Sequence, residues 1–156
     1  MNAKWNPIVS SDFNVPRLYE IENFVFKPLT VNDIEEDYQA IIASIDYIKS
    51  ICTFDFYPEW PSKDMTKAED LSNLGWHQTE FEFRTSFAYV VRSPIDSEYI
   101  GCAYIFPSNT DGYEVDVYTW VKAGKKDLNE SLFDCTKKWI DGTWPFTLVN
   151  YPNRTC

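Results

Sequence analysis

Two acidic residues in an alternating segment are the first candidates for catalysis. In the run 113–121, Glu114 and Asp116 lie two positions apart, and because side chains of a strand alternate between its two faces, we expect both carboxylates on one face. Tyr118 and Trp120 continue that face. A carboxylate beside aromatic rings and a second carboxylate can have its pKa raised, which suits a base that takes a proton from an ammonium group. The alternative is an exposed strand face with ordinary acidic residues.

His77 is the single histidine of the chain and a second candidate base, because imidazole titrates near neutral pH. It lies beside Leu74 and Phe81, which belong to the apolar stripe of a predicted helix. The alternative is a histidine at the edge of a helix whose hydrogen bonds are satisfied within the fold.

Four cysteines are spread over the chain without CxxC or CxxH spacing. With one histidine available, this pattern predicts no structural metal site, and it predicts no disulfide framework. The candidate chemistry therefore rests on carboxylates and aromatic side chains.

An α/β (α+β) scaffold is predicted to position these residues, in the order strand, two helices, three strands, helix, strand. Capping boxes at Asn32–Glu35 and Thr66–Glu69 mark two helix starts. The spacing of apolar residues predicts helices at 34–48, 66–81 and 127–142. Apolar runs and alternation predict strands at 18–29, 87–92, 99–106, 113–121 and 145–151. Residues 1–18 are expected to form an N-terminal arm and residues 19–156 a single domain. The aromatic and proline-rich loop 54–62 is expected either to line a pocket or to close the bottom of the core.

Three segments resemble the GNAT acetyltransferase superfamily, over about residues 17–154 of the chain. Phe26-Lys-Pro-Leu-Thr-Val-Asn-Asp33 is similar to the opening of the first strand and helix in these enzymes, Tyr99-Ile-Gly-Cys-Ala-Tyr-Ile-Phe106 to the third strand, and Val115-Asp-Val-Tyr-Thr-Trp-Val121 to the fourth. Residues 74–80 and 144–146 resemble a small bacterial subgroup of GNAT-like proteins. The resemblance implies a GNAT-like, mixed and mostly antiparallel sheet flanked by helices, truncated after the fifth strand.

The same resemblance implies an acetyl-CoA-dependent transfer of an acetyl group to a primary amine. Asp116, with Glu114 as the alternative, takes the place of the base, and Tyr151 is a candidate for the acid that reprotonates the leaving thiolate. The splayed end of the fourth strand and the loop after it would hold acetyl-CoA. The residues carried over to that role are Trp120, Val121, Lys122, Gly124, Lys125, Lys126 and Asn153.

The loop 121–127 departs from the family, since it has one glycine where the pattern has two. Its three lysines are expected to supply charge in place of amide geometry, or else to be solvated lysines on a turn. Asp127, as the cap of the next helix, would occupy the amides that a pyrophosphate needs. These departures support an alternative: a non-catalytic GNAT-like module that binds a ligand or a partner and has lost the cofactor loop.

The resemblance also implies that further C-terminal elements of the family are missing, which would leave a sheet face with Tyr118 and Trp120 open. We expect this face to be covered either by the N-terminal arm, with Trp5 and Phe13, or by a second subunit. A homodimer is therefore a hypothesis of the sequence.

The composition limits the partners. The 156 residues include 14 basic and 24 acidic side chains, a net charge of −10, which argues against nucleic acid and anionic membranes and suits a cationic small-molecule or peptide amine. No segment has the apolar length of a membrane span or the pattern of a secretory signal, so we expect a cytoplasmic protein.

Overall fold

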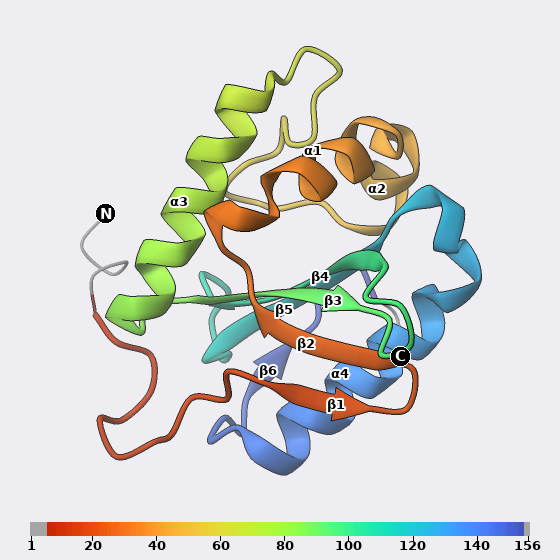
Figure 1. Ribbon diagram of the computed structural model, residues 1–156. Helices are drawn as coiled ribbons and strands as arrows, with labels where there is room; N and C mark the ends of the chain where they lie inside the picture. Colours follow the sequence, from red (N-terminus) through yellow and green to blue (C-terminus); the bar gives the residue numbers. More distant parts are fainter. Residues whose placement is uncertain (1–5, 155–156) are drawn as a thin grey trace.

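The computed structural model describes residues 6–154, which form one curled six-stranded sheet with helices on both faces (Figure 1). The strands lie in sequence order, with antiparallel pairs from β1 to β5 and a parallel pair between β5 and β6. Figure 1 shows α1, α2 and α3 on one side of the sheet and α4 on the other. The strands are β1 (Tyr19–Ile21), β2 (Phe24–Pro28), β3 (Phe87–Arg92), β4 (Tyr99–Pro107), β5 (Val115–Val121) and β6 (Val149–Asn150). The helices are η2 (Val31–Asp33), α1 (Ile34–Ile42), α2 (Ile45–Ile51), α3 (Lys67–Phe83), η3 (Ala123–Leu128) and α4 (Asn129–Thr143).

The single strand predicted at 18–29 is wrong, because this segment is the hairpin of β1 and β2. Tyr19 pairs with Phe26 across the hairpin, and Glu22 takes a left-handed conformation with φ of 50° at the turn. A glutamate in that region gives no strong turn signal in a sequence.

The single helix predicted at 34–48 is also wrong, because α1 ends at Ile42 and α2 begins at Ile45. The capping box lies two residues earlier than expected: the Thr30 amide donates to Asp33 Oδ2 over 3.0 Å, and the Thr30 side chain accepts from the backbone in return. The second predicted box is confirmed, since Thr66 and Glu69 cap α3.

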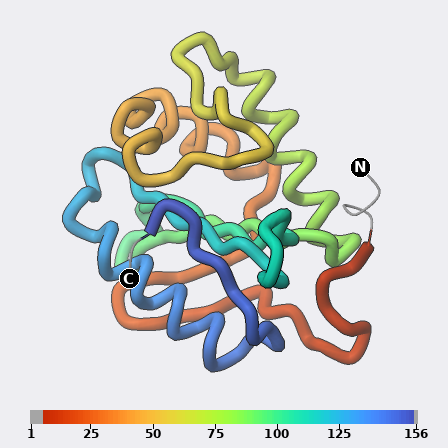
Figure 2. Tube along the Cα trace, turned by 180° about the vertical axis from the view of Figure 1, so that it is seen from behind, coloured from red at the N-terminus to blue at the C-terminus, as the bar shows by residue number. Residues whose placement is uncertain are grey.

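Two hydrophobic cores lie on the two faces of the sheet. One contains side chains of α1–α3 and of the segment after α2, which runs in yellow from the α1–α2 pair toward α3 in Figure 2. Tyr118 and Trp120 are buried in this core, 3% and 0% exposed, against Phe54 and Trp60. The open face expected from the sequence is therefore wrong. The segment 54–60 covers it, and the reason for expecting a homodimer falls away, although oligomeric state itself stays a prediction.

The other core lies between the sheet, α4 and residues 8–16. Phe13 packs on Trp144 with ring centroids 5.2 Å apart, and the Tyr89 hydroxyl donates to the Pro16 carbonyl over 2.7 Å. The N-terminal segment thus contributes to the core of the α4 face. Trp5, which the sequence also assigned to covering a face, lies outside the described residues.

β4 and β5 approach each other closely at Gly101. A Cβ atom on Gly101 would lie 1.9 Å from the Trp120 carbonyl oxygen, so this position excludes every other residue type. Beyond β5 the chain crosses through η3 and α4 before it returns as β6, which is two residues long where the sequence predicted a strand at 145–151.

Within residues 6–154, no helix has both the length and the apolar character that a membrane span requires. Cys52, Cys102 and Cys135 are reduced and buried. Cys156 lies outside the described residues.

Candidate functional site

The parallel strands β5 and β6 pair over two positions and then separate. Val115 faces Val149 and Asp116 faces Asn150, after which β6 ends while β5 continues to Val121. Among the described residues, the outer edge of β5 from 117 to 121 has no strand partner. We call this opening the β5–β6 split. It leaves backbone groups of β5 available to partners other than a strand.

Asp116 lies at the paired end of the split. Its Oδ1 accepts from the Ser108 hydroxyl over 2.7 Å and from the Asn150 side-chain amide over 3.0 Å, and the residue is 7% exposed. The carboxylate thereby joins the end of β4 to β6. It lies beside the split, but its Oδ1 already accepts the two hydrogen bonds that link the chain after β4 to β6.

Glu114 precedes β5 and is exposed. Its Oε2 accepts from the backbone amides of Thr147 and Leu148, each over 2.8 Å. These hydrogen bonds lower the pKa of Glu114, because they stabilise the charged form. A carboxylate with a lowered pKa is a weaker base, so Asp116 is the better placed of the two candidates.

The C-terminal residues of the described chain reach into the split. Arg154 Nη2 donates to the Thr119 carbonyl over 3.3 Å, to the Thr119 hydroxyl over 3.1 Å and to Asn129 Oδ1 over 2.9 Å. Its guanidinium also lies 4.9 Å from the Phe133 ring centroid. The preceding residue, Asn153, contacts the segment after α2: its side-chain amide donates to the Thr53 carbonyl over 3.0 Å. Arg154 therefore satisfies a backbone acceptor of β5 that a ligand in the split would otherwise use.

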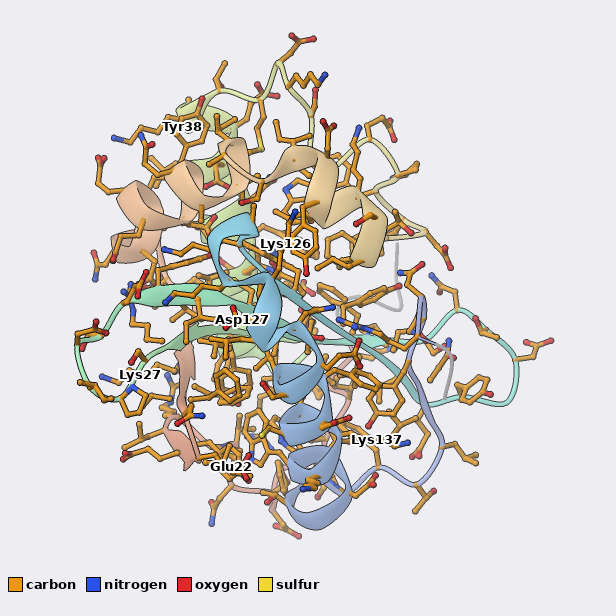
Figure 3. All side chains as sticks on the ribbon, turned by 90° about the vertical axis from the view of Figure 1, so that its right-hand side faces the viewer. Glu22, Lys27, Tyr38, Lys126, Asp127 and Lys137 are labelled. Carbon is orange, nitrogen blue, oxygen red and sulfur yellow. The ribbon has the colours of Figure 1, made fainter. Side chains whose placement is uncertain are left out.

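The lysines that follow β5 are spread around η3. Lys122 and Lys125 both pair with Glu98, at 3.2 and 2.9 Å. Lys126 lies over the Tyr47 ring, 4.9 Å from its centroid, and Figure 3 shows it on the turn between the α1–α2 layer and α4. The Glu98 contacts raise the pKa of Lys125 and lower that of Glu98, so part of the positive charge here is already balanced within the chain.

The start of α4 differs from the expectation. Asp127 belongs to η3, and the residue before α4 is Leu128, whose side chain makes no capping hydrogen bond. The prediction that Asp127 caps this helix is wrong, because a 3₁₀ turn lies between β5 and α4. The Asn129 amide at the start of α4 donates to the Lys126 carbonyl of η3 instead of to a side-chain cap.

The other predicted site residues are not brought together as a cluster. The side chains of Trp120 and Val121 are fully buried, in opposite cores. The Trp120 carbonyl faces Gly101 of β4, so it does not face the split. Tyr151 follows β6 and packs edge-on against Phe133 of α4, with ring centroids 5.4 Å apart. Gly124 lies in a groove of about 400 Å³ between the α1–α2 turn and η3, where the Ala123 amide donates to Ser44 Oγ over 2.8 Å.

A second, separate constellation was not expected from the sequence. Asp37 of α1 and Asp70 of α3 are 2% and 1% exposed, and a hydrogen bond joins their carboxyl groups. Burial and the neighbouring Asp70 raise the pKa of Asp37 well above its ordinary value, while burial also raises that of Asp70. The Tyr99 hydroxyl donates to Asp37 Oδ1, and Cys102 Sγ lies 3.2 Å from the same hydroxyl. A signal existed: both aspartates lie four residues before an apolar position of their helix.

His77 lies on the rim of this constellation. Its ring stacks on Tyr104 at 5.3 Å, and burial lowers its pKa to about 3, so the imidazole is neutral at physiological pH. Such a group is a hydrogen-bond acceptor rather than a base in a reaction at neutral pH. The segment 54–60 packs over the constellation, with Phe54 and Trp60 buried and Phe56 and Tyr57 exposed.

The comparisons with known proteins concern the fold. No model of a protein family matches the sequence, and no curated protein does. A ribosomal-protein-S5-alanine acetyltransferase from Vibrio fischeri matches with a TM-score of 0.57 and 12% identity, over 81% of this chain and 67% of that one. The microcin C7 self-immunity acetyltransferase MccE, solved with acetyl-CoA and AMP, matches with a TM-score of 0.58 and 9% identity, over 79% and 66%.

A third match is RimL, a ribosomal L7/L12 α-N-protein acetyltransferase in complex with coenzyme A, with a TM-score of 0.61 and 8% identity over 81% of this chain and 70% of that one. The chain spans about two thirds of the length of these structures. The six-stranded order, the parallel last pair and these matches agree with one another: the chain has the fold of the GNAT acetyltransferases.

Proposed function

We propose that the protein transfers an acetyl group from acetyl-CoA to a primary amine. The observation that carries the proposal is the β5–β6 split followed by η3 and α4: a strand edge with available backbone groups leads to a helical segment that begins with η3 and its lysines. Backbone amides at a helix N-terminus favour a negatively charged group such as pyrophosphate. The matches to structures solved with acetyl-CoA and with coenzyme A support the same assignment.

The residues of this chain would divide the work as follows. The Thr119 carbonyl and the backbone of Val121 would hold the amide-rich arm of acetyl-CoA along the split, with Arg154 moving off Thr119. Trp120 would contribute through its buried side chain, which fixes this part of β5. Lys125 and Lys126 of η3 would hold the phosphates. The co-substrate supplies an activated acyl group as its thioester.

Asp116 would accept the proton of the attacking ammonium group, since it lies at the end of the split, next to Ser108 and Asn150. Tyr151, one residue beyond β6, would return a proton to the leaving thiolate. Proton transfer of this kind contributes about 10²–10⁴-fold to a rate. Glu114 serves as a structural partner of the backbone at 147–148 in this arrangement.

Calorimetric titration with acetyl-CoA tests the proposal. We expect micromolar binding that weakens about tenfold, or about 1.4 kcal/mol, in Lys125→Ala/Lys126→Ala. Lys49→Ala/Lys63→Ala removes the same charge from exposed positions away from the split and serves as the control.

If acetyl-CoA binds, amines can be screened for acetylation, and Asp116→Asn should then lower kcat with little change in acetyl-CoA affinity. Absence of binding at millimolar acetyl-CoA would rule out acetyl transfer. That result would favour a non-catalytic module in which Arg154 permanently occupies the split.

A further inference from the structure

We propose that the pocket between α1, α3 and the segment 54–60 binds a primary ammonium group, with Asp70 as its counter-ion. Six aromatic rings line this aromatic pocket: Phe54, Phe56, Tyr57, Trp60, Trp76 and Tyr104. Asp37, Asp70 and His77 also line it. The site is distinct from the β5–β6 split, and the proposal goes beyond acetyl transfer.

The charge in the pocket is the first argument. Asp37 and Asp70 line the same pocket, and their mutual hydrogen bond requires a proton on one of the two carboxyl groups. That hydrogen bond and Tyr99 give Asp37 its partners, whereas Asp70 Oδ2 is buried without a hydrogen-bond partner. Within residues 6–154, no lysine or arginine forms an ion pair with either group. A buried carboxylate that lacks both a hydrogen bond at one oxygen and an ion pair would be stabilised by a bound cation.

The walls of the aromatic pocket fit a cation. Faces of tryptophan and tyrosine rings attract a positive charge, and the attraction grows when the charge is desolvated. His77 Nδ1 is also buried without a hydrogen-bond partner among the described residues. An ammonium group has three N–H donors. Asp70 Oδ2 can accept one of them, and His77 Nδ1 can accept another in the tautomer that carries its proton on Nε2.

The size of the pocket selects the kind of cation. Its volume of about 30 Å³ corresponds to one or two water-sized groups. This suits an –NH₃⁺ group with the first carbon of its chain, and it excludes a trimethylammonium head. Phe56 and Tyr57, 39% and 38% exposed, give the entrance, while the two aspartates are enclosed. A ligand would therefore enter with its ammonium group first and leave its remaining part outside.

The position of the pocket leaves two sources for the ligand. Tyr104 in its wall pairs across the sheet with Tyr118 of β5, which also contacts Phe54 at 4.8 Å. The bound ammonium can thus belong to the acetyl acceptor, as a second amine of the same molecule, or to a separate ligand. The shared chemistry is a primary ammonium at the end of an unbranched chain.

Titration with n-butylammonium chloride, followed by the fluorescence of the tryptophans, tests the site without acetyl-CoA. We expect saturable binding to the wild type and binding weakened about tenfold or more in Asp70→Asn, which keeps the shape of the side chain but removes its charge. Asp64→Asn removes the same charge from an exposed loop position just before α3 and should bind like the wild type. Tetramethylammonium chloride and 1-butanol, as the oversized and the neutral probe, should not compete.

Equal binding by the wild type and Asp70→Asn, or no saturable binding of n-butylammonium, would overturn the site and leave ordered water as its occupant. Acetyl-CoA titration of the same variants separates this outcome from that of the proposed function, because the pocket and the split are different sites. Acetylation of 1,4-diaminobutane with a KM raised in Asp70→Asn and an unchanged kcat would identify the ligand as the acceptor. Binding without such an effect would identify a separate ligand.

Discussion

The buried pair of Asp37 and Asp70 costs stability in the free protein. A carboxylate away from water is expensive unless a partner compensates it, and Asp70 Oδ2 has no hydrogen-bond partner. Apolar residues of similar volume at such positions are often neutral or stabilising, so a buried acidic pair is weak evidence for a structural role. The cost is consistent with a group kept ready for a ligand.

Asp70→Asn should therefore stabilise the free protein near pH 7, by about 1–3 kcal/mol. A raised carboxyl pKa means that the folded state binds more protons than the unfolded state between the ordinary and the raised pKa. Stability of the wild type then falls as pH rises through that window. The gain from the substitution should be largest at neutral pH and shrink toward pH 4, as denaturant unfolding at both pH values would measure.

Asp64→Asn is the matched control for that series and should change stability little at either pH. A variant at position 70 that is less stable than the wild type at pH 7 would contradict the prediction. A gain that is independent of pH would contradict its electrostatic cause.

The two aspartates also show what residue patterns can and cannot predict. Asp37 lies four residues before Ile41, and Asp70 four before Leu74, so helical periodicity places each on the buried side of its helix. A charged residue on that side is a visible irregularity. That α1 and α3 would bring the two together depends on how the helices pack, which no local pattern encodes.

At the level of elements, local chemistry predicted α3, β3 and β4 well, because each is specified within its own segment. The Thr66–Glu69 capping box starts α3, and near-continuous apolar runs mark the two central strands. At the break between α1 and α2, Ser44 makes a long-range contact: its Oγ accepts from the Ala123 amide, 79 residues along the chain. Apolar periodicity predicted one helix over 34–48, because a local pattern carries no information about a contact between Ser44 and Ala123.

The close approach of β4 and β5 gives a prediction for two glycines. Gly101→Ala should destabilise the protein by about 3 kcal/mol, because its Cβ would meet backbone atoms of Trp120 that have no room to move. Gly142→Ala, in α4 with nothing within 4 Å of the added atom, should instead stabilise by up to about 1 kcal/mol. Denaturant unfolding measures both, and an equal effect of the two substitutions would show that steric contact is not the cause.

At the scale of the whole molecule, residues 8–16 act as part of the α4-side core. Phe13→Ala should lower stability by about 1–2 kcal/mol, less than a fully buried phenylalanine would cost, since Phe13 is only partly buried. Ile95→Ala removes apolar surface from a residue that is 93% exposed and should have almost no effect. If thermal unfolding finds Phe13→Ala as silent as Ile95→Ala, the segment is not a structural part of the core.

The order of the strands has a consequence for how the chain folds and breathes. Three of the first four pairings, β1–β2, β3–β4 and β4–β5, join strands that lie close together in the chain, so these hairpins can form early and at a small loop-closure cost. The β2–β3 pairing is different, because α1, α2 and α3 lie between its two strands. The β5–β6 pairing joins Asp116 to Asn150 across 34 residues and covers only two positions. Because it covers only two positions, it is the pairing that costs least to open, and hydrogen exchange should be fastest along this edge of the sheet. Access to the β5–β6 split then requires only a local fluctuation of β6, while the hairpins that hold the two cores stay closed.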